Sequence, residues 1–188
     1  MDTTIMEYTA EDLISHKLQR SGILVAKPKF DNEGADLLAF LGVSDGAKFC
    51  RIQCKGRSLI NSPSSTIDVP KEYVTDAFTL FLFVETGNPN STHLFCFFGK
   101  DIRETWRCSS DNRSFTLSLS QKKLSDDLAR YEFGDNRVSE LKKVIINVNV
   151  EGEFHKVMYG YGEATLPAIR MSGRGTFIPP SHTKPKSR

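Results

Sequence analysis

Apolar and polar residues along the chain alternate in patterns that predict helices interleaved with strands. Residues 9–20 show rough helical spacing behind a capping threonine. Residues 78–85 and 93–98 are near-continuous apolar runs, as expected for strands covered on both faces. The other predicted helices are 70–76, 100–106 and 122–131, and the other predicted strands are 23–26, 35–43, 48–55, 67–69 and 114–119. The pattern does not decide the secondary structure of residues 138–150, because their first half has helical spacing and their β-branched second half favours an extended strand.

Composition fits one globular domain with a flexible end. The chain has 188 residues, of which 39% are hydrophobic and 26% charged. A chain of this length buries enough surface to fold without disulfide or metal cross-links. From residue 173 onward the sequence consists mainly of Gly, Pro, Ser, Thr and basic residues. We therefore expect a single domain over residues 1–172 and a basic flexible tail over residues 173–188.

The compartment is predicted from what the sequence lacks. It has no apolar stretch approaching the roughly 18 residues of a membrane span, and its start has no basic, apolar leader. We expect a cytoplasmic protein without membrane contact. The four cysteines form no CxxC pair and lie largely in apolar runs, so they predict reduced, mostly buried thiols instead of a zinc site. The phenylalanines of 78–98 and Trp106 are interpreted as core, not as a base-stacking platform.

The predicted hairpin of 35–43 and 48–55 carries the most informative polar residues. Side chains alternate across a strand, so residues two apart share a face. One face of the second strand therefore carries three polar residues in succession, Arg51, Gln53 and Lys55. Asp36 stands at the start of an apolar run in the first strand, where an isolated carboxylate needs a partner or a purpose. Glu11, in the first helix, can supply another carboxylate.

A helix Glu, a strand Asp and a Gln-x-Lys on the next strand resemble the PD-(D/E)XK nuclease superfamily, in particular its restriction-endonuclease-like and Holliday-junction-resolvase-like members. The resemblance is carried by Glu11, by Gly-Ala-Asp-Leu-Leu at 34–38 and by Ile-Gln-Cys-Lys-Gly at 52–56. It implies an α/β fold of the restriction-endonuclease type: a mixed central sheet flanked by helices, with an α-β-β-β-α-β core.

The same resemblance implies metal-dependent hydrolysis of DNA phosphodiester bonds. Asp36 would be the principal ligand of Mg²⁺ or Mn²⁺, with Glu11 and the backbone carbonyl of Cys54 as further ligands. Lys55 would lie next to the attacking water, which its ammonium can hold as hydroxide. Gln53 departs from the Glu or Asp usual at its position and offers an oxygen without the charge. Glu11 is our first candidate to compensate, and Glu33, on the turn before Asp36, is the second.

Basic residues beside the motif predict contacts to phosphate. The formal net charge is only +2, but residues 1–45 carry four basic and eight acidic side chains, whereas residues 46–57 carry four basic and none acidic. The candidates for nucleic-acid contact are Lys48, Arg51 and Arg57. The implied partner is duplex or branched DNA, and a homodimer is consistent with cutting two strands.

Two other interpretations of these residues stay open. Asp36 and Lys55 can form an ordinary cross-strand ion pair, with Gln53 as a solvated residue and Glu11 placed by the helix dipole. The neutral Gln53 also fits a catalytically inactive nuclease-fold protein that binds nucleic acid or serves in assembly. A soluble interaction domain, with the polar face of the hairpin as a protein interface, is a third possibility.

Overall fold

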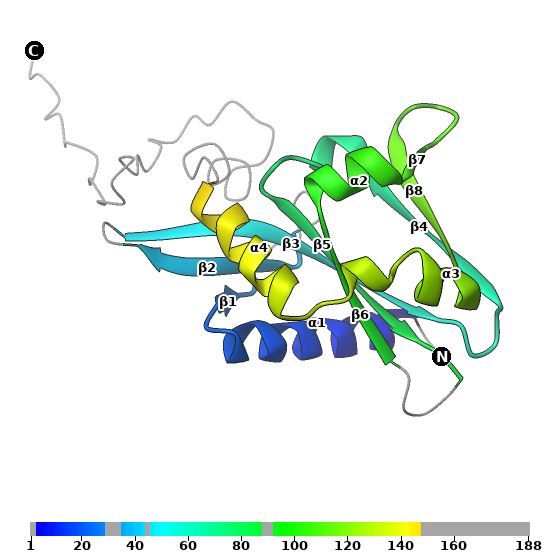
Figure 1. The fold of residues 1–188 in the computed structure, drawn as a ribbon, viewed down its shortest axis with the longest axis horizontal. Helices are drawn as coiled ribbons and strands as arrows, with labels where there is room; N and C mark the ends of the chain where they lie inside the picture. Colours follow the sequence, from blue (N-terminus) through cyan, green and yellow to red (C-terminus); the bar gives the residue numbers. More distant parts are fainter. Residues whose placement is uncertain (1–2, 29–34, 44–45, 88–91, 148–188) are drawn as a thin grey trace, which may run out of the picture.

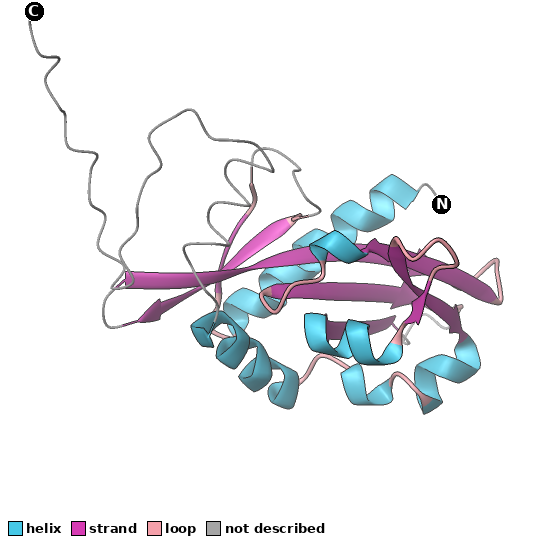
Figure 2. Cartoon of the chain, turned by 90° about the horizontal axis from the view of Figure 1, so that it is seen from above, coloured by secondary structure: helices cyan, strands magenta, loops and turns pink. Residues whose placement is uncertain are grey.

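A five-stranded mixed sheet forms the centre of the molecule in the computed structural model, which describes residues 3–28, 35–43, 46–87 and 92–147 (Figure 1). Its strand order is β1-β2-β3-β5-β6, and only the β3–β5 pair is parallel. The strands are β1 (Leu24–Ala26), β2 (Leu37–Val43), β3 (Gly46–Ser58), β5 (Phe78–Glu85) and β6 (Thr92–Phe98). The hairpin of β2 and β3 extends beyond the helices (Figure 2).

Two helices cover one face of this sheet. They are α1 (Thr3–Arg20) and α4 (Asp135–Asn147), and α4 crosses β2 and β3 (Figure 1). Buried side chains of both helices share one core cluster with Cys50, Ile52 and Cys54 of β3. Alternation along the strand therefore places Arg51, Gln53 and Lys55 on the opposite face.

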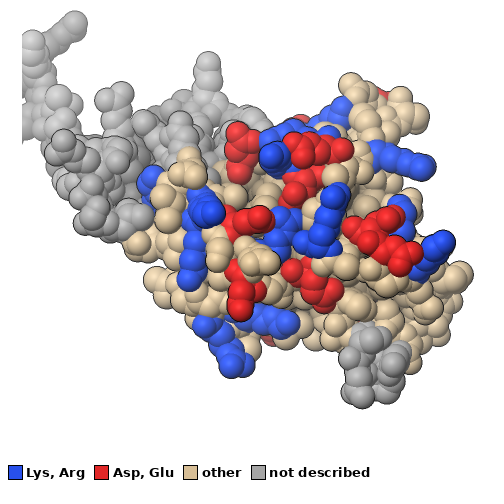
Figure 3. Space-filling model, in the orientation of Figure 1, with Lys and Arg blue, Asp and Glu red and all other residues tan. Residues whose placement is uncertain are grey.

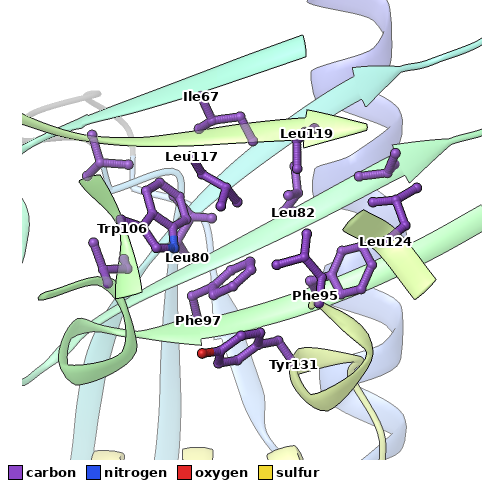
Figure 4. Packing of buried hydrophobic residues seen from close by; sticks show 14 of the residues in the cluster. Ile67, Leu80, Leu82, Phe95, Phe97, Trp106, Leu117, Leu119, Leu124 and Tyr131 are labelled. Atoms are coloured by element: carbon purple, nitrogen blue, oxygen red, sulfur yellow. The ribbon is translucent and has the colours of Figure 1, made fainter. Parts of the chain in front are cut away.

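The opposite face packs against a second layer that the sequence did not predict as a separate sheet. Its strands are β4 (Ser64–Pro70), β7 (Arg107–Cys108) and β8 (Ser114–Ser120), in the order β4-β8-β7. It is completed by α2 (Gly99–Thr105), α3 (Gln121–Asp126) and the 3-10 helices η1 (Lys71–Tyr73) and η2 (Ala129–Tyr131). Apolar side chains of this layer pack on Leu80, Leu82, Phe95 and Phe97 of the central sheet (Figure 4).

Most predicted elements are present, with different ends. The first helix begins at Thr3 instead of residue 9, because the preceding residues contain no glycine or proline that would end it. Strand β3 is longer than predicted since it has two partners in turn, β2 on one edge and parallel β5 on the other. The predicted helix 70–76 is only the 3-10 turn η1. The crossover from β3 to β5 therefore runs through β4 and η1, not through an α-helix.

The C-terminal elements correct two further predictions. Residues 122–131 form two helices, α3 and η2, because the N–H groups of Asp127 and Leu128 both donate to the Lys123 carbonyl and end α3. The β-branched residues near 145 lie in α4, where burial of Leu141 and Ile145 outweighs their weak preference for strands. Residues 148–150, the remainder of the predicted domain 1–172 and the predicted tail 173–188 lie outside the described residues.

The core predictions are confirmed. Phe78, Phe81, Phe95 and Phe97 are fully buried, and Trp106 is 6% exposed. All four cysteines are free thiols, three of them buried and Cys108 exposed. Among the helices that the structure describes, none is long and apolar enough to cross a membrane.

Gly99, at the start of α2, lies against the backbone of Thr75, which follows η1. A Cβ atom built there would lie 2.0 Å from the backbone oxygen of Thr75 and 3.0 Å from its carbonyl carbon. We expect Gly99→Ala to lower the free energy of unfolding by about 1–3 kcal/mol or more, because backbone must move. Gly134→Ala is the control, since no atom lies within 4 Å of its added Cβ. Urea unfolding measures both, and equal stability of the two variants would contradict the prediction.

Candidate active site

The candidate site begins where the ladder between β2 and β3 ends. The last backbone partners are Leu37 and Ile52, and the N–H of Asp36 donates to the Ile52 carbonyl at 2.9 Å. Beyond this point β3 continues without β2. The Asp36 carboxylate fills the gap, because its Oδ2 accepts a hydrogen bond from the N–H of Cys54 at 2.5 Å. The carbonyl of a strand residue points to the same edge as its N–H. The Cys54 carbonyl therefore projects toward the edge that Asp36 borders.

Gln53 is buried next to this edge, and its side-chain oxygen makes no hydrogen bond to the described residues. Its side chain is on the polar face of β3 and the residue is 6% exposed. Its Oε1 has no hydrogen-bond partner among the described residues. A buried acceptor left unpaired lowers stability by about 1–3 kcal/mol, so most such atoms in proteins are satisfied. The sequence-based alternative of a solvated Gln53 is therefore wrong.

Glu11 approaches the site from α1 and is paired with a residue that the sequence had not singled out. Its Oε2 accepts a hydrogen bond from Nζ of Lys27, just after β1. The Glu11 side chain is 13% exposed, whereas that of Lys27 is 58% exposed. This hydrogen bond holds the pKa of Lys27 above its usual value. A lysine one residue past a short strand has no periodic signal, so the sequence offered no means of finding this pair.

Four charged side chains act on the buried thiol of Cys54. Burial raises the pKa of its thiol well above the usual value, and the negative charges of Asp36 and Glu11 raise it further. The positive charges of Lys55 and Lys27 act on the same thiol in the opposite direction. The charges of these four side chains therefore act on one position of β3, although 44 positions separate Glu11 from Lys55. Without a bound cation, the thiol is therefore protonated near neutral pH.

The three basic residues predicted to contact nucleic acid occupy different surroundings. Arg51 is 0% exposed, and its Nη2 donates to the Tyr73 carbonyl at 3.3 Å and to Thr75 Oγ1 at 3.2 Å. This position contradicts our expectation that Arg51 lies on a surface open to phosphate. The alternation of side chains had placed it beside Lys55 correctly, but the second layer covers that part of the face.

Lys48 and Arg57 also make contacts within the protein. Nζ of Lys48 donates to the carbonyl of Ile146 in the last turn of α4, where a cation is favoured by the helix dipole. Arg57 donates from Nη1 to the Gly56 carbonyl at 2.7 Å and from Nε to the Thr66 carbonyl of β4 at 3.4 Å. Both side chains are half-buried, and their contact with phosphate stays a prediction.

The donor set of the site suits a hard divalent cation. Within the part of the chain that the structure describes, no three His, Cys, Asp or Glu side chains lie close enough to hold a metal ion. The candidate donors are the Asp36 and Glu11 carboxylates, the Cys54 carbonyl and the unpaired Gln53 side-chain oxygen. Oxygen donors of this kind are the ligands that Mg²⁺ and Mn²⁺ prefer. Glu33, the second candidate acid, lies outside the described residues.

Comparison with solved structures identifies the fold. No family model and no curated protein sequence matches the chain. A bacterial homing endonuclease matches with a TM-score of 0.52 and 12% identity, over 78% of this chain and 98% of the other. The Holliday junction resolvase of Archaeoglobus fulgidus, an archaeal hyperthermophile, matches with a TM-score of 0.43 and 10% identity, over 71% of this chain and 95% of the other. The chain has a nuclease fold of the restriction-endonuclease type, which confirms the predicted fold class.

Proposed function

We propose that this protein is a metal-dependent endonuclease that hydrolyses DNA phosphodiester bonds at the edge of β3. The observation that carries the proposal is the position of Asp36 at the end of the β2–β3 ladder of a nuclease fold, where its carboxylate accepts the N–H of Cys54, the residue between Gln53 and Lys55. The similarity in fold to a homing endonuclease supports it.

Each residue has a distinct part in the proposed reaction. Asp36, Glu11, the Cys54 carbonyl and Gln53 Oε1 would hold Mg²⁺ or Mn²⁺. The bound cation supplies positive charge that offsets the negative charge developing on the phosphate. Lys55, half-buried on the same face as Gln53, would orient the attacking water and hold it as hydroxide. A second copy of the chain would supply a second site for the other strand of a duplex.

A cleavage assay with the full chain tests the proposal directly. Supercoiled, linear and branched DNA are incubated with Mg²⁺, with Mn²⁺ or with EDTA. Cutting of at least one substrate in either metal, and none in EDTA, is the expected result. If no substrate is cut under any metal condition, the endonuclease proposal is wrong.

A catalytically inactive nucleic-acid-binding protein is the second candidate, favoured by the neutral Gln53. Such a protein would bind DNA with an affinity that falls as salt rises, without cutting it. Acidic and basic side chains are interspersed on the face shown in Figure 3, so that face presents no single-sign field for DNA. Tight calorimetric binding of Mn²⁺ that depends on Asp36 would count against this candidate.

Replacing Gln53 by glutamate tests its place in the donor set. We expect Gln53→Glu to bind Mn²⁺ at least about tenfold more tightly, because unit charges 4 Å apart interact by about 4 kcal/mol at an effective dielectric constant near 20, less the desolvation of the carboxylate. Without metal the variant should be less stable than wild type, since it buries an additional carboxylate. Titration calorimetry and thermal unfolding with and without Mn²⁺ measure the two effects.

The exposed Gln121 offers a matched control. Gln121→Glu should leave both metal affinity and stability unchanged. If Gln53→Glu binds Mn²⁺ no better than this control, Gln53 does not face the cation.

A further inference from the structure

Lys27 is bonded to the candidate ligand Glu11 but has no part in the proposed reaction. In register, Ala26 of β1 faces Leu38 of β2, which faces Arg51 of β3. The next row along the sheet therefore runs from Lys27 toward Leu37 and Ile52, and the row after it contains Asp36. Lys27 therefore lies at the same end of the sheet as Leu37 and Ile52, the last pair of the β2–β3 ladder.

The ion pair between Lys27 and Glu11 is asymmetric. The carboxylate is 13% exposed, whereas the lysine is 58% exposed. The ammonium also lies 5.2 Å from the centroid of the Tyr8 ring, a favourable cation-π distance. Because the lysine is largely exposed, its ammonium can return to water when another cation takes its place on the carboxylate.

The acidic and the basic side chains that act on the Cys54 thiol are equal in number. Because Gln53 is neutral, the two acids Asp36 and Glu11 are balanced by the two lysines that act on the same thiol, Lys55 and Lys27. A divalent cation that binds Glu11 Oε2 takes the place of the ammonium. Once displaced, the exposed ammonium can pair with a phosphate of the nucleic-acid backbone, because Asp12 is the only other carboxylate among the described residues that is seen to act on it.

We propose that Lys27 is a displaceable counter-ion of Glu11, which gives way to the divalent cation and then binds a backbone phosphate of the nucleic acid. Cation and nucleic acid therefore bind with positive cooperativity. The inference rests on the proposed function, because it takes Glu11 as a ligand of the cation.

Metal affinity of the full-length protein tests the first half of the inference. Mn²⁺ binding is measured calorimetrically without nucleic acid for wild type, Lys27→Met, Lys27→Arg and Asp36→Asn. Lys27→Met should bind Mn²⁺ about fivefold more tightly, because the competing charge is gone. Lys27→Arg, which keeps the charge, should resemble wild type. Lys100→Met is the matched control, since Lys100 pairs with Glu104 on the surface of α2.

Salt dependence of DNA binding tests the second half. A DNA duplex is titrated over a range of salt concentrations, in Ca²⁺ and in EDTA, and log Kd is plotted against log salt. Loss of one phosphate contact lowers the magnitude of this slope by about 1. We expect that reduction for Lys27→Met in Ca²⁺ and no change in EDTA, where Lys27 is still bound to Glu11.

The outcomes separate this inference from the function on which it rests. If Asp36→Asn weakens Mn²⁺ binding but Lys27→Met binds as wild type does, Lys27 is not a counter-ion and the endonuclease proposal stands. An unchanged slope for Lys27→Met in Ca²⁺ likewise overturns the phosphate contact alone. If wild type binds no Mn²⁺ in these titrations, both proposals are wrong.

Discussion

Asp36→Asn is expected to reduce metal-dependent cutting by about 10²–10³-fold or more, the loss seen when one group that stabilises transition-state charge is removed. The substitution removes the negative charge that we assign to the metal. Its amide oxygen can still accept the hydrogen bond from the N–H of Cys54, which Asp36 accepts at 2.5 Å. The fold should therefore survive, with the free energy of unfolding changed by about 1 kcal/mol or less. Initial rates of DNA cutting in Mg²⁺, together with urea unfolding, measure both quantities.

Two further variants make the result specific to the site. Lys55→Met should lose cutting while still binding Mn²⁺, because Lys55 is assigned to the water and not to the metal. Asp76→Asn is the control, since this aspartate is 93% exposed and pairs with Arg103 outside the site. If Asp36→Asn cuts as fast as Asp76→Asn does, the assignment of Asp36 is wrong.

The second sheet, β4-β8-β7, packs on the face of the central sheet that α1 and α4 leave open, and its packing is the subject of the second prediction with a large expected effect. Phe97 of β6 is fully buried between Trp106 and Tyr131, with ring centroids 5.4 and 4.7 Å from its own (Figure 4). We expect Phe97→Ala to lower the free energy of unfolding by about 3–5 kcal/mol, because it removes apolar contacts from both layers and leaves a cavity. Such a loss is a large part of the stability of a domain, about 5–15 kcal/mol.

Guanidinium unfolding with two companion variants checks this expectation. Phe97→Leu keeps most of the volume and should cost less than about 1.5 kcal/mol. Ile60→Ala removes an apolar side chain that is 51% exposed and should change stability by about 0.5 kcal/mol or less. A loss below about 1 kcal/mol for Phe97→Ala would mean that the second layer adjusts to fill the cavity.

Elements with a strong periodic pattern were predictable, and those that depend on distant partners were not. The run at Phe78–Glu85 is a buried strand because all of its residues except Thr79 and Glu85 are apolar and can be covered on both faces. The second sheet could not be foreseen, since its strands β4 and β8 pair across about 50 positions. The same holds for α4, whose helical form is stabilised by the sheet beneath it.

The candidate site divides in the same way. Alternation along one strand correctly placed Arg51, Gln53 and Lys55 on one face, because the two-residue period is a property of the extended backbone. Alternation does not say what covers that face. The second layer buries Arg51 completely and leaves Lys55 half-exposed, although the two are only four residues apart.

By itself, the sequence determined most helix and strand types, the polar face of β3 and the order of acid, acid, Gln and Lys, since all of these follow from spacing along the chain. Only the tertiary structure decided which of those polar groups meet and which are already occupied. Lys27 reaches Glu11 across 16 positions and Lys48 reaches Ile146 across 98. The partner of a charged side chain is set by which elements pack together, and that depends on burial of the whole core, not on local pattern.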